Sequence, residues 1–424
     1  MNNTELKEFV PTVKQTYRKT SYFPRVFLSP IRLLYRLLQQ FGRKFRVDAW
    51  VISGDESQKT SITTVFTGNE KNKNYLNNLL FNNPCSEVHI GKIWRWNSIK
   101  IVHKKPMGCS LRISEIHKNS RKLPGNKASF FIPCWVGGEA DLSADISTII
   151  HKKSLNSDLN KIKQGNMQFE ITKEKSRFDN FYYTMYLPYV TRVHKNRAIP
   201  LPYETMKKNL KRCDLLMVKK DSEFIAGQLI IYNNDIPRLW FTGLKNGNTD
   251  YLKDHITGAM YYFAMTYLKQ KGCKRVHFGL TRPFLNDGVF QYKKKRSLQI
   301  TDSSKIGFLI QPLRKLTIVK EFFLRNPFIY LEKGKFYGAV FIDNDQLHSQ
   351  EDCEKIYETY YIKGLSKLTM YLFGDNQKNM KEAIPPKLFD RISLHSAETL
   401  FEKKNTVPDT SPCFSVKDLR IIVL

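Results

Sequence analysis

The sequence predicts a mixed α/β fold, in the α/β or α+β range, and two patterns carry this prediction. Three segments rich in β-branched and aromatic residues, 213–220, 224–232 and 236–243, are separated by the turn-forming sequences DSE and NND, which predicts a β-meander. Apolar residues at helical spacing follow over 256–272, and a further strand pattern covers 274–279. This order predicts a mixed sheet with a helix against one face.

Composition narrows the class of protein. The 424 residues suffice for two or three domains, and 41% hydrophobic with 13% aromatic residues is typical of a folded chain. The formal charge of +30 favours polyanionic partners such as nucleic acid, anionic lipid or phosphorylated substrates; alternatively it is a solvated surface without a specific partner. Seven scattered cysteines without a CxxC pair indicate reduced thiols in a cytoplasmic protein, and no spacing predicts a metal site.

The N-terminal part predicts a basic amphipathic helix after a loose polar leader. Apolar residues from Leu34 to Phe45 share one helical face, while Arg32, Arg36 and Arg43 lie on another. One interpretation is a helix on the anionic inner surface of a membrane, with residues 24–46 making a peripheral contact. The alternative is a helix that packs on the protein's own core.

The rest of the chain alternates between strand and helix patterns. Before the meander we expect a helix over 143–163 ended by Gly165, and a helix over 178–193 that is interrupted or ends near Pro188. The other predicted strands are 46–53, 61–68, 87–96, 98–105, 129–138, 167–173, 306–313, 316–323, 327–333, 336–342 and 419–424, and the other predicted helices are 75–81, 201–213, 353–374, 384–393 and 397–403.

Four stretches together resemble a known fold family. They are 151–172, a basic helix and a strand; 178–193, the next helix; 224–232, a central strand; and 271–295, a strand, a loop and a run of lysines. In this order they are similar to the GNAT superfamily, and more closely to its FemAB-like branch with two GNAT-like halves. The resemblance covers about 140–300. It implies mixed sheets flanked by helices. It also implies four parts of the chain: a basic leader with its amphipathic helix (1–45), a first GNAT-like half (46–139), a second GNAT-like half that carries the acyltransferase activity (140–300), and an α/β extension (301–424).

The resemblance implies an enzyme that transfers an acyl or aminoacyl group to an amine. The donor in such families is an acyl-CoA such as acetyl-CoA, or aminoacyl-tRNA. The implied acceptor is a small amine or a lipid- or nucleotide-linked sugar, as in the modification of cell-envelope or polysaccharide precursors. Two departures stand against this: the R/QxxGxG/A pyrophosphate pattern is absent, and Arg296-Ser297 replace a usual Trp-Gly. The rival hypothesis is a non-catalytic protein that binds RNA or an anionic surface with the same fold.

The resemblance also selects candidate site residues between the last strand and the lysine run. Lys293 matches the lysine of the family's final segment, and would hold a donor phosphate or a developing oxyanion. Arg282 and Lys294 are further candidate donor contacts, Asp287 is a candidate general base, and Tyr292 a candidate hydrogen-bond donor.

Each of these residues also has a structural interpretation. The lysines at 293–295 are alternatively exposed surface charge, and Arg282 alternatively pairs with Asp287 to brace the loop. An aspartate before glycine is typical of a turn, and Tyr292 fits a core position equally well. His277, alone on its strand, is more typical of a packed or solvent-facing residue than of a catalyst.

Overall fold

The structure, a computed structural model, describes most of the chain between residues 46 and 401. The described ranges are 46–57, 60–81, 85–95, 109–119, 129–194, 200–233, 236–313, 317–343, 346–374 and 383–401. Three predicted segments lie outside these ranges: the amphipathic helix over 24–46, of which only residue 46 is described, the strand 98–105 and the last strand 419–424. No helix in the described ranges is long and apolar enough to cross a membrane.

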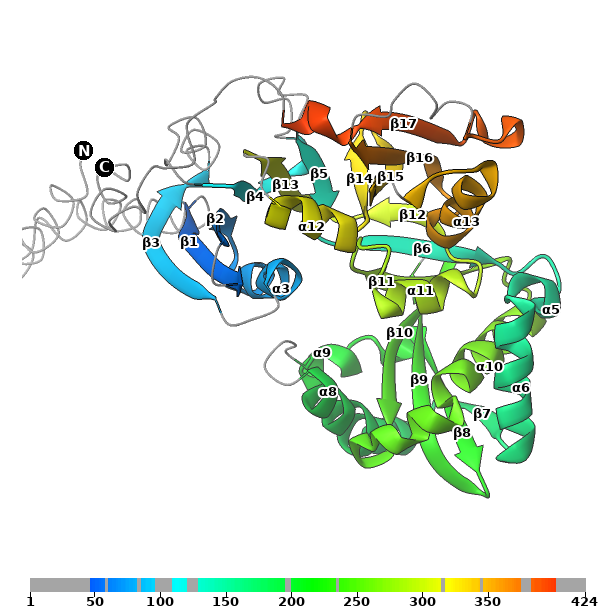
Figure 1. The fold of residues 1–424 in the computed structure, drawn as a ribbon. Helices are drawn as coiled ribbons and strands as arrows, with labels where there is room; N and C mark the ends of the chain where they lie inside the picture. The colour runs from blue at the N-terminus through cyan, green and yellow to red at the C-terminus, as the bar shows by residue number, and fades with distance from the viewer. Residues whose placement is uncertain are drawn as a thin grey trace, which may run out of the picture.

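Three sheets form the described part of the molecule (Figure 1). The first is six-stranded, in the order β3-β1-β2-β4-β13-β5, with helix α3 (Glu70–Leu80) between β2 and β3 in the chain. Its strands are β1 (Arg46–Ser57), β2 (Thr60–Gly68), β3 (Ser86–Trp94), β4 (Leu111–His117), β5 (Phe130–Pro133) and β13 (Ile306–Pro312).

The second sheet is seven-stranded and contains the predicted meander, which is confirmed. Its order is β12-β6-β11-β10-β9-β8-β7, and helices α7–α9 cover one face of the meander while α6 and α10 cover the other (Figure 1). The strands are β6 (Val136–Asp141), β7 (Gln168–Thr172), β8 (Cys213–Lys220), β9 (Glu223–Asn233), β10 (Ile236–Leu244), β11 (Arg275–Thr281) and β12 (Gln299–Ser303); the helices are α5 (Ile146–Ile149), α6 (Lys152–Gln164), α7 (Lys175–Asn180), α8 (Leu187–His194), α9 (Tyr203–Lys207), α10 (Ile256–Gln270) and α11 (Gly288–Lys294).

The first two sheets exchange a strand with each other. β6 directly follows β5 of the first sheet, yet it pairs antiparallel with β11 and β12 of the second. β13 directly follows β12 of the second sheet, yet it pairs antiparallel with β4 and β5 of the first. The chain therefore passes from the first sheet to the second between β5 and β6, and it returns to the first sheet between β12 and β13.

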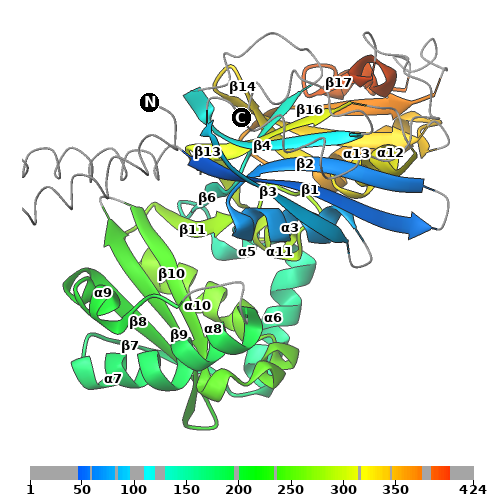
Figure 2. The same cartoon turned by 90° about the vertical axis from the view of Figure 1, so that its left-hand side faces the viewer.

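A third, four-stranded sheet follows, and Figure 2 shows the meander and its helices on the opposite side of the molecule from it. β14 and β15 are antiparallel, whereas β15, β16 and β17 run parallel. Aromatic side chains of this sheet, such as Phe341, pack with Phe130 of β5, so the first and third sheets share one core. The elements are β14 (Phe328–Glu332), β15 (Lys335–Asp343), β16 (Leu365–Phe373), β17 (Ile392–Ser396), α12 (Thr317–Arg325) and α13 (Gln350–Tyr360).

Several expectations from the sequence differ from the structure. The helix expected over 384–393 contains the 3-10 turn Pro386–Leu388 and runs into β17, and the described part of that expected over 397–403 contains the 3-10 turn Ala397–Leu400. The helix expected over 143–163 is broken at Ile150 and His151, which have extended ψ angles, into α5 and α6. The strand expected over 316–323 is helix α12, because its apolar side chains also fit the helical period and are buried on one face. The helix expected over 353–374 ends at Tyr360, and its second half is β16.

The helix expected over 178–193 is interrupted shortly before Pro188, but it does not end there. A π-helical segment, Phe181–Tyr186, precedes it, and the backbone N–H of Leu187 bonds to the carbonyl of Tyr182. α8 then runs through Pro188 to His194. A π turn shifts the hydrogen-bond register locally, so the helix tolerates a residue that lacks its own N–H.

The β8–β9 hairpin gives a prediction for stability. Its two-residue turn places Asp221 at φ 48° and Ser222 at φ 71°, the left-handed region that glycine enters without steric cost. We expect Ser222→Gly to raise the free energy of unfolding by about 1 kcal/mol. Denaturant titration measures the free energy of unfolding. Ser222→Val is the matched control, and we expect this variant to have a lower free energy of unfolding than the wild type. Equal stabilities of the glycine and valine variants would contradict the prediction.

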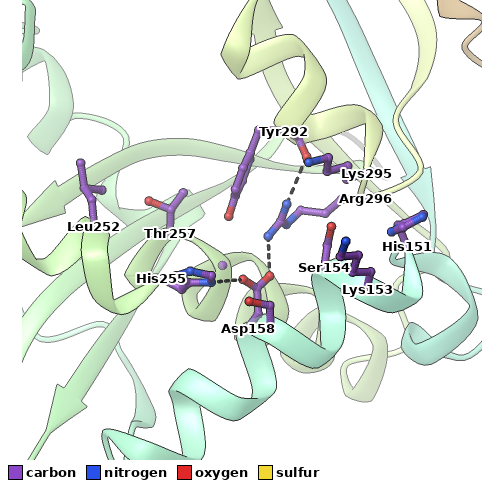
Figure 3. Close-up of a pocket in the computed structure, with 12 residues that line it drawn as sticks. His151, Lys153, Ser154, Asp158, Leu252, His255, Thr257, Tyr292, Lys295 and Arg296 are labelled. Carbon is purple, nitrogen blue, oxygen red and sulfur yellow. Dashed lines mark hydrogen bonds and ion pairs between the residues drawn. The ribbon is translucent and has the colours of Figure 1, made fainter. Parts of the chain in front are cut away.

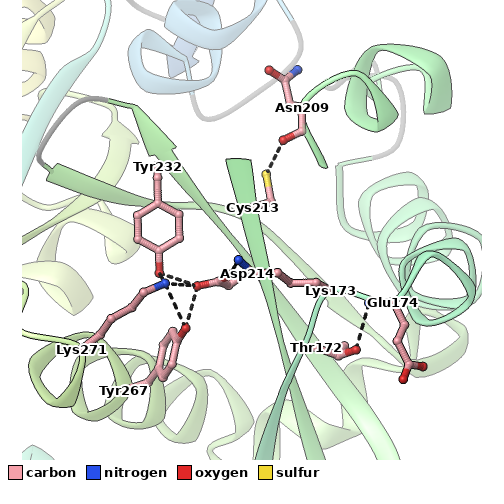
Figure 4. A network of polar contacts seen from close by, with 9 residues as sticks. All are labelled: Thr172, Lys173, Glu174, Asn209, Cys213, Asp214, Tyr232, Tyr267 and Lys271. Atoms are coloured by element: carbon pink, nitrogen blue, oxygen red, sulfur yellow. Dashed lines mark hydrogen bonds and ion pairs between the residues drawn. The ribbon is translucent and has the colours of Figure 1, made fainter. Parts of the chain in front are cut away.

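A buried aspartate joins β8 to β9 and to the end of α10 (Figure 4). The Asp214 side chain is fully buried; Tyr232 and Tyr267 each donate a hydrogen bond of 2.6 Å to its Oδ2, and Lys271 donates one of 2.7 Å. Burial by itself raises the pKa of this carboxyl, but the three donors together lower its pKa to about 2. The network therefore stabilises the fold while Asp214 is ionised.

The Asp214 network predicts a loss of stability in acid. The folded pKa of about 2 lies below the unfolded value of about 3.9, so the contribution is complete above pH ~4 and is lost as the pH falls towards 2. We expect Asp214→Asn to lower the free energy of unfolding at pH 7, and its difference from the wild type to shrink at pH 3. Urea titrations at both pH values measure this, with the exposed Asp390→Asn as control. A difference that stays constant with pH would count against it.

Candidate active site

The second sheet diverges between two neighbouring parallel strands. β10 and β11 pair at Arg238 and His277 alone, whereas the antiparallel pairs on the other side of β10 are nearly continuous. A register shift between Leu239 and Phe241 marks a bulge in β10 next to this point. A sheet held together by a single residue pair leaves backbone groups of both strands unpaired beyond it, and these are available to a ligand.

A polar cluster surrounds the single pair. The Nδ1 atom of His277 accepts hydrogen bonds from Arg238 Nε at 3.1 Å and from the backbone N–H of Gly279 at 2.9 Å. Because Nδ1 is an acceptor, the neutral ring carries its proton on Nε2, which lies 3.5 Å from Oδ1 of Asp302. This hydrogen bond from His277 lowers the pKa of the Asp302 carboxyl. The cluster therefore fixes the orientation of both charged side chains around a buried imidazole.

Gly137 makes this cluster sterically feasible. β6 lies between β11 and β12, and Gly137 of β6 is opposite Asp302 in the register. A Cβ atom at Gly137 would lie 1.6 Å from Oδ1 of Asp302 and 2.9 Å from Nε2 of His277. Because Gly137 has no side chain, the Asp302 carboxylate can reach His277 across the intervening strand β6.

Lys293, the leading candidate from the sequence, lies beside the end of β11. Its side chain is 5% exposed, and its Nζ donates a hydrogen bond of 3.0 Å to the carbonyl of Leu280. Burial lowers the pKa of this amine to about 8; the charge of Asp287 opposes the shift and that of Arg238 adds to it. Lys293 is therefore within electrostatic reach of both residues, and a large fraction of it is neutral near pH 8.

The other predicted residues point to different sides of α11. Asp287 is its N-cap and accepts a 2.9 Å hydrogen bond from the backbone N–H of Phe290. Lys294 donates a 2.7 Å hydrogen bond to the carbonyl of Glu358 at the end of α13. The Tyr292 ring lies 3.6 Å from the guanidinium carbon of Arg296, on another side again. Lys293 is thus within electrostatic reach of Asp287, whereas Lys294 and Tyr292 contact other groups.

Arg282 connects the end of β11 in the second sheet to residues of the first sheet and its helix α3. Its Nη1 donates to the carbonyl of Cys134 at 3.1 Å, and its guanidinium carbon lies 3.9 Å and 4.0 Å from the rings of Tyr75 and Trp135. Burial lowers the pKa of this guanidinium, and the phenol of Tyr75 and the thiol of Cys134 act in the opposite direction. No ion pair links it to Asp287 within the described ranges. Arg282 therefore packs against aromatic rings next to α3 and β5.

A pocket of 570 Å³ lies on the other side of α11 (Figure 3). At its floor, Arg296 Nη2 and Asp158 Oδ2 form an ion pair of 2.5 Å, and Nδ1 of His255 lies 3.2 Å from the same carboxylate. Asp158 is 5% and Arg296 2% exposed. Residues of α6, of the segment that begins α10 and of the end of α11 line it: His151, Lys153, Ser154, Ser157, Asp158, Leu252, His255, Thr257, Gly258, Tyr292, Lys295 and Arg296.

The departure at Arg296-Ser297 leaves the local turn intact. Ser297 has φ 56°, the left-handed conformation that a glycine would adopt at this position, and its hydroxyl donates a 2.5 Å hydrogen bond to the carbonyl of Ile149. Arg296 fills the place of a large apolar residue by stacking on Tyr292 and pairing with Asp158. The turn therefore survives without its usual Trp-Gly sequence.

The first turn of α10 has a carboxylate packed against it. A helix N-terminus binds phosphate groups through its free N–H groups. At this turn a Cβ atom on Gly258 would lie 2.2 Å from Oδ1 of Asp158, so the carboxylate of Asp158 already lies against the helix start. This carboxylate, paired with Arg296, therefore already occupies space against the first turn of α10.

The strand order now assigns the fold. The meander β8–β9–β10, the crossover helix α10, the parallel strand β11 with its divergence, and the bulge in β10 form the arrangement that the resemblance implied. The second sheet is therefore GNAT-like in its strand order, as the sequence predicted. No family model and no curated protein matches the sequence.

Solved structures with related folds share little sequence with this GNAT-like chain. L-PGS from Bacillus licheniformis is 11% identical, with 65% of this chain and 84% of that one covered and a TM-score of 0.33. FemX is 10% identical, with coverages of 62% and 84% and a TM-score of 0.32. A tandem GNAT protein from the clavulanic acid biosynthesis pathway is 10% identical, with coverages of 51% and 68% and a TM-score of 0.26. At these TM-scores the likenesses carry no weight for the site.

Four residues of the GNAT-like site were not selected from the sequence. Arg238, Asp302 and Asp158 each stand alone in their segments, and His277 is a lone strand histidine. The sequence signal for this cluster is the pair Gly137-Gly138 in β6, since a glycine inside a strand marks a place where another group approaches the backbone closely. Which side chains approach Gly137 depends on the strand order, and the sequence does not reveal that order. No group of histidine, cysteine and carboxylate side chains within the described ranges is arranged to hold a metal ion.

Proposed function

We propose that this protein is an acyltransferase that passes an acyl group to an amine where β10 and β11 diverge. The observation that carries the proposal is the position of Lys293. It is a buried amine that bonds to the carbonyl of Leu280 near the end of β11, within electrostatic reach of Arg238. Its pKa of about 8 suits a base near neutral pH. Amine acylation needs a base near neutral pH and a positive group near the carbonyl oxygen, and these two residues supply both.

The proposed roles follow from the contacts. The acceptor nitrogen attacks the acyl carbonyl carbon, and the neutral Nζ of Lys293 accepts the proton that this nitrogen loses. The positive charge of Arg238, held by Nδ1 of His277, stabilises the oxygen anion that forms on the carbonyl. The carbonyl then reforms, the ester C–O bond breaks, and Lys293 returns the proton to the leaving oxygen.

We further propose that the acyl donor is an aminoacyl-tRNA and not an acyl-CoA. Asp158 lies against the first turn of α10, where the pyrophosphate of CoA would otherwise bind. The net charge of +30 favours a long polyanionic donor. The acceptor class remains that of the sequence prediction, a small amine or a lipid- or nucleotide-linked sugar with an amine.

A transfer assay tests the donor. Purified protein is mixed with amine acceptors and either tRNA charged with radiolabelled amino acids or radiolabelled acetyl-CoA. We expect label to move from tRNA to an amine, with transfer from acetyl-CoA at the level of a Lys293→Met control. Transfer from acetyl-CoA alone would overturn the donor assignment but leave the acyltransferase proposal standing. No transfer from either donor would overturn both.

A second candidate function is RNA binding without catalysis, which the net charge of +30 also favours. This alternative predicts salt-dependent retention of tRNA that Lys293→Met leaves unchanged, together with no turnover of any acyl donor. The acyltransferase proposal predicts the same retention with turnover. The two hypotheses are thus separated by turnover and not by binding.

A further inference from the structure

Arg238 of β10 is held by a neutral side chain and not by a carboxylate. Its Nε donates a 3.1 Å hydrogen bond to Nδ1 of His277, and its Nη2 lies 3.5 Å from Nε2 of the same ring. Among the described residues, no carboxylate forms an ion pair with this guanidinium. A neutral acceptor orients an arginine without cancelling its positive charge, whereas a carboxylate partner would cancel much of that charge. The charge of Arg238 therefore remains available to an anionic oxygen.

The nearest negative charge lies at the other ring nitrogen of His277. Oδ1 of Asp302 is 3.5 Å from Nε2, and half of the Asp302 side chain is exposed. Glu139 is opposite His277 in the strand register, but its carboxylate pairs with Arg275 at 3.1 Å. His277 therefore separates the carboxylate of Asp302 from the guanidinium of Arg238 while it contacts both groups.

A single protonation state of His277 satisfies all of these contacts. Nδ1 accepts hydrogen bonds from Arg238 and from the backbone N–H of Gly279 at 2.9 Å, so it carries no proton. An ionised carboxylate only accepts hydrogen bonds, so Asp302 requires the proton on Nε2. In a cationic ring the proton on Nδ1 would face two other donors. The contacts therefore select the neutral ring with its proton on Nε2.

We propose that Asp302 and His277 are positioning residues of the transfer site. Asp302 holds His277 in the Nε2–H tautomer, and His277 in turn orients Arg238 towards the carbonyl oxygen of the acyl donor. This inference rests on the proposed function. Neither residue moves a proton in the reaction, since the proton of the acceptor amine passes to Lys293. Loss of the alignment is expected to lower kcat more than it changes KM, because Arg238 stabilises charge that develops in the transition state.

Two substitutions at His277 test the acceptor that holds Arg238. The side-chain oxygen of asparagine can take the place of Nδ1, whereas that of glutamine lies at the distance of Nε2. We expect His277→Asn to retain at least about a third of the wild-type kcat and His277→Gln to lose at least about tenfold. The KM for charged tRNA is expected to stay within about twofold in both variants. Equal losses in the two variants, or losses in KM alone, would overturn the positioning of Arg238.

Two substitutions at Asp302 test the second contact. Asparagine still offers an oxygen to the Nε2–H group, whereas leucine offers none. We expect Asp302→Asn to lower kcat by less than about threefold and Asp302→Leu to lower it by at least about tenfold. Thr301→Val is the matched control on β12, because Thr301 is exposed and contacts Glu139, and we expect the wild-type rate. Equal losses in both Asp302 variants would overturn the hydrogen bond to His277.

NMR of the full chain with ¹⁵N-labelled histidine tests the tautomer without turnover. The signals of His277 are identified by their absence in His277→Asn. We expect the Nε2–H tautomer in the wild type and a second form of the ring in Asp302→Leu. An Nδ1–H tautomer in the wild type, or identical spectra of the two proteins, would overturn the inference. A wild type without transfer activity would overturn the proposed function, while the spectra would still decide whether Asp302 holds the ring of His277.

Discussion

Arg296→Met is expected to lower the free energy of unfolding by about 3–5 kcal/mol, because it strands the buried carboxylate of Asp158. The ion pair is 2.5 Å long, and both side chains are almost fully buried between α6, α10 and α11. Methionine fills much of the arginine volume, so the expected loss comes mainly from the unpaired charge. The ring of His255, with Nδ1 at 3.2 Å, is the other side chain paired with Asp158 in the described structure, and 39% of the His255 side chain is exposed.

The double variant Asp158→Leu with Arg296→Met is the matched control. It removes both charges at once, and we expect it to recover most of the lost stability, since apolar replacement of a buried ion pair is often neutral or stabilising. Urea titrations of the wild type, both single variants and the double variant give the coupling energy directly. Single-variant losses below about 1 kcal/mol would contradict the view that this pair is shielded from water.

Lys293→Met is expected to lower the transfer rate at least about 100-fold while the fold is retained, because the variant loses the proposed base. In the wild type the rate is expected to rise with pH and to level off above about 8, since Lys293 acts as a base only when neutral and its pKa is about 8. The pH profile of kcat/KM with the charged tRNA donor measures this.

Lys305→Met is the control for the general loss of a positive charge. Lys305 is exposed between β12 and β13, and we expect its variant to keep the wild-type rate and pH profile. A rate that falls equally in both variants would indicate donor attraction by net charge. A pH profile that stays unchanged in a still-active Lys293→Met variant would remove Lys293 as the base.

Local patterns were enough to predict the elements whose burial follows one period. The meander and α10 are confirmed because turn residues and an apolar helical face repeat within short windows, and Gly272, with φ 83°, follows the end of α10. α12 was predicted as a strand because a short apolar run fits both periods, and the choice is made by packing against the core that the first and third sheets share. The strand exchange depends on pairing over some 170 residues of chain, which no window contains.

The candidate site was predictable only in part for the same reason. Lys293 was found because its segment resembles a family pattern, and its burial and low pKa are visible only in three dimensions. The cluster of Arg238, His277 and Asp302 comes from three strands, and Gly137 of a fourth strand allows it. Each of these residues is ordinary in its own segment, so the sequence alone gave no reason to combine them.

The strand exchange between β6 and β13 has a consequence for biosynthesis. The first sheet lacks an internal strand until the ribosome has synthesised residue 312, although its other strands are complete by residue 133. Until then the edges of β4 and β5 remain open to pairing with other chains. Folding is therefore expected to be largely post-translational for both sheets, with a high dependence on chaperones. Separately expressed halves divided near residue 140 would each lack the strand that the other half supplies.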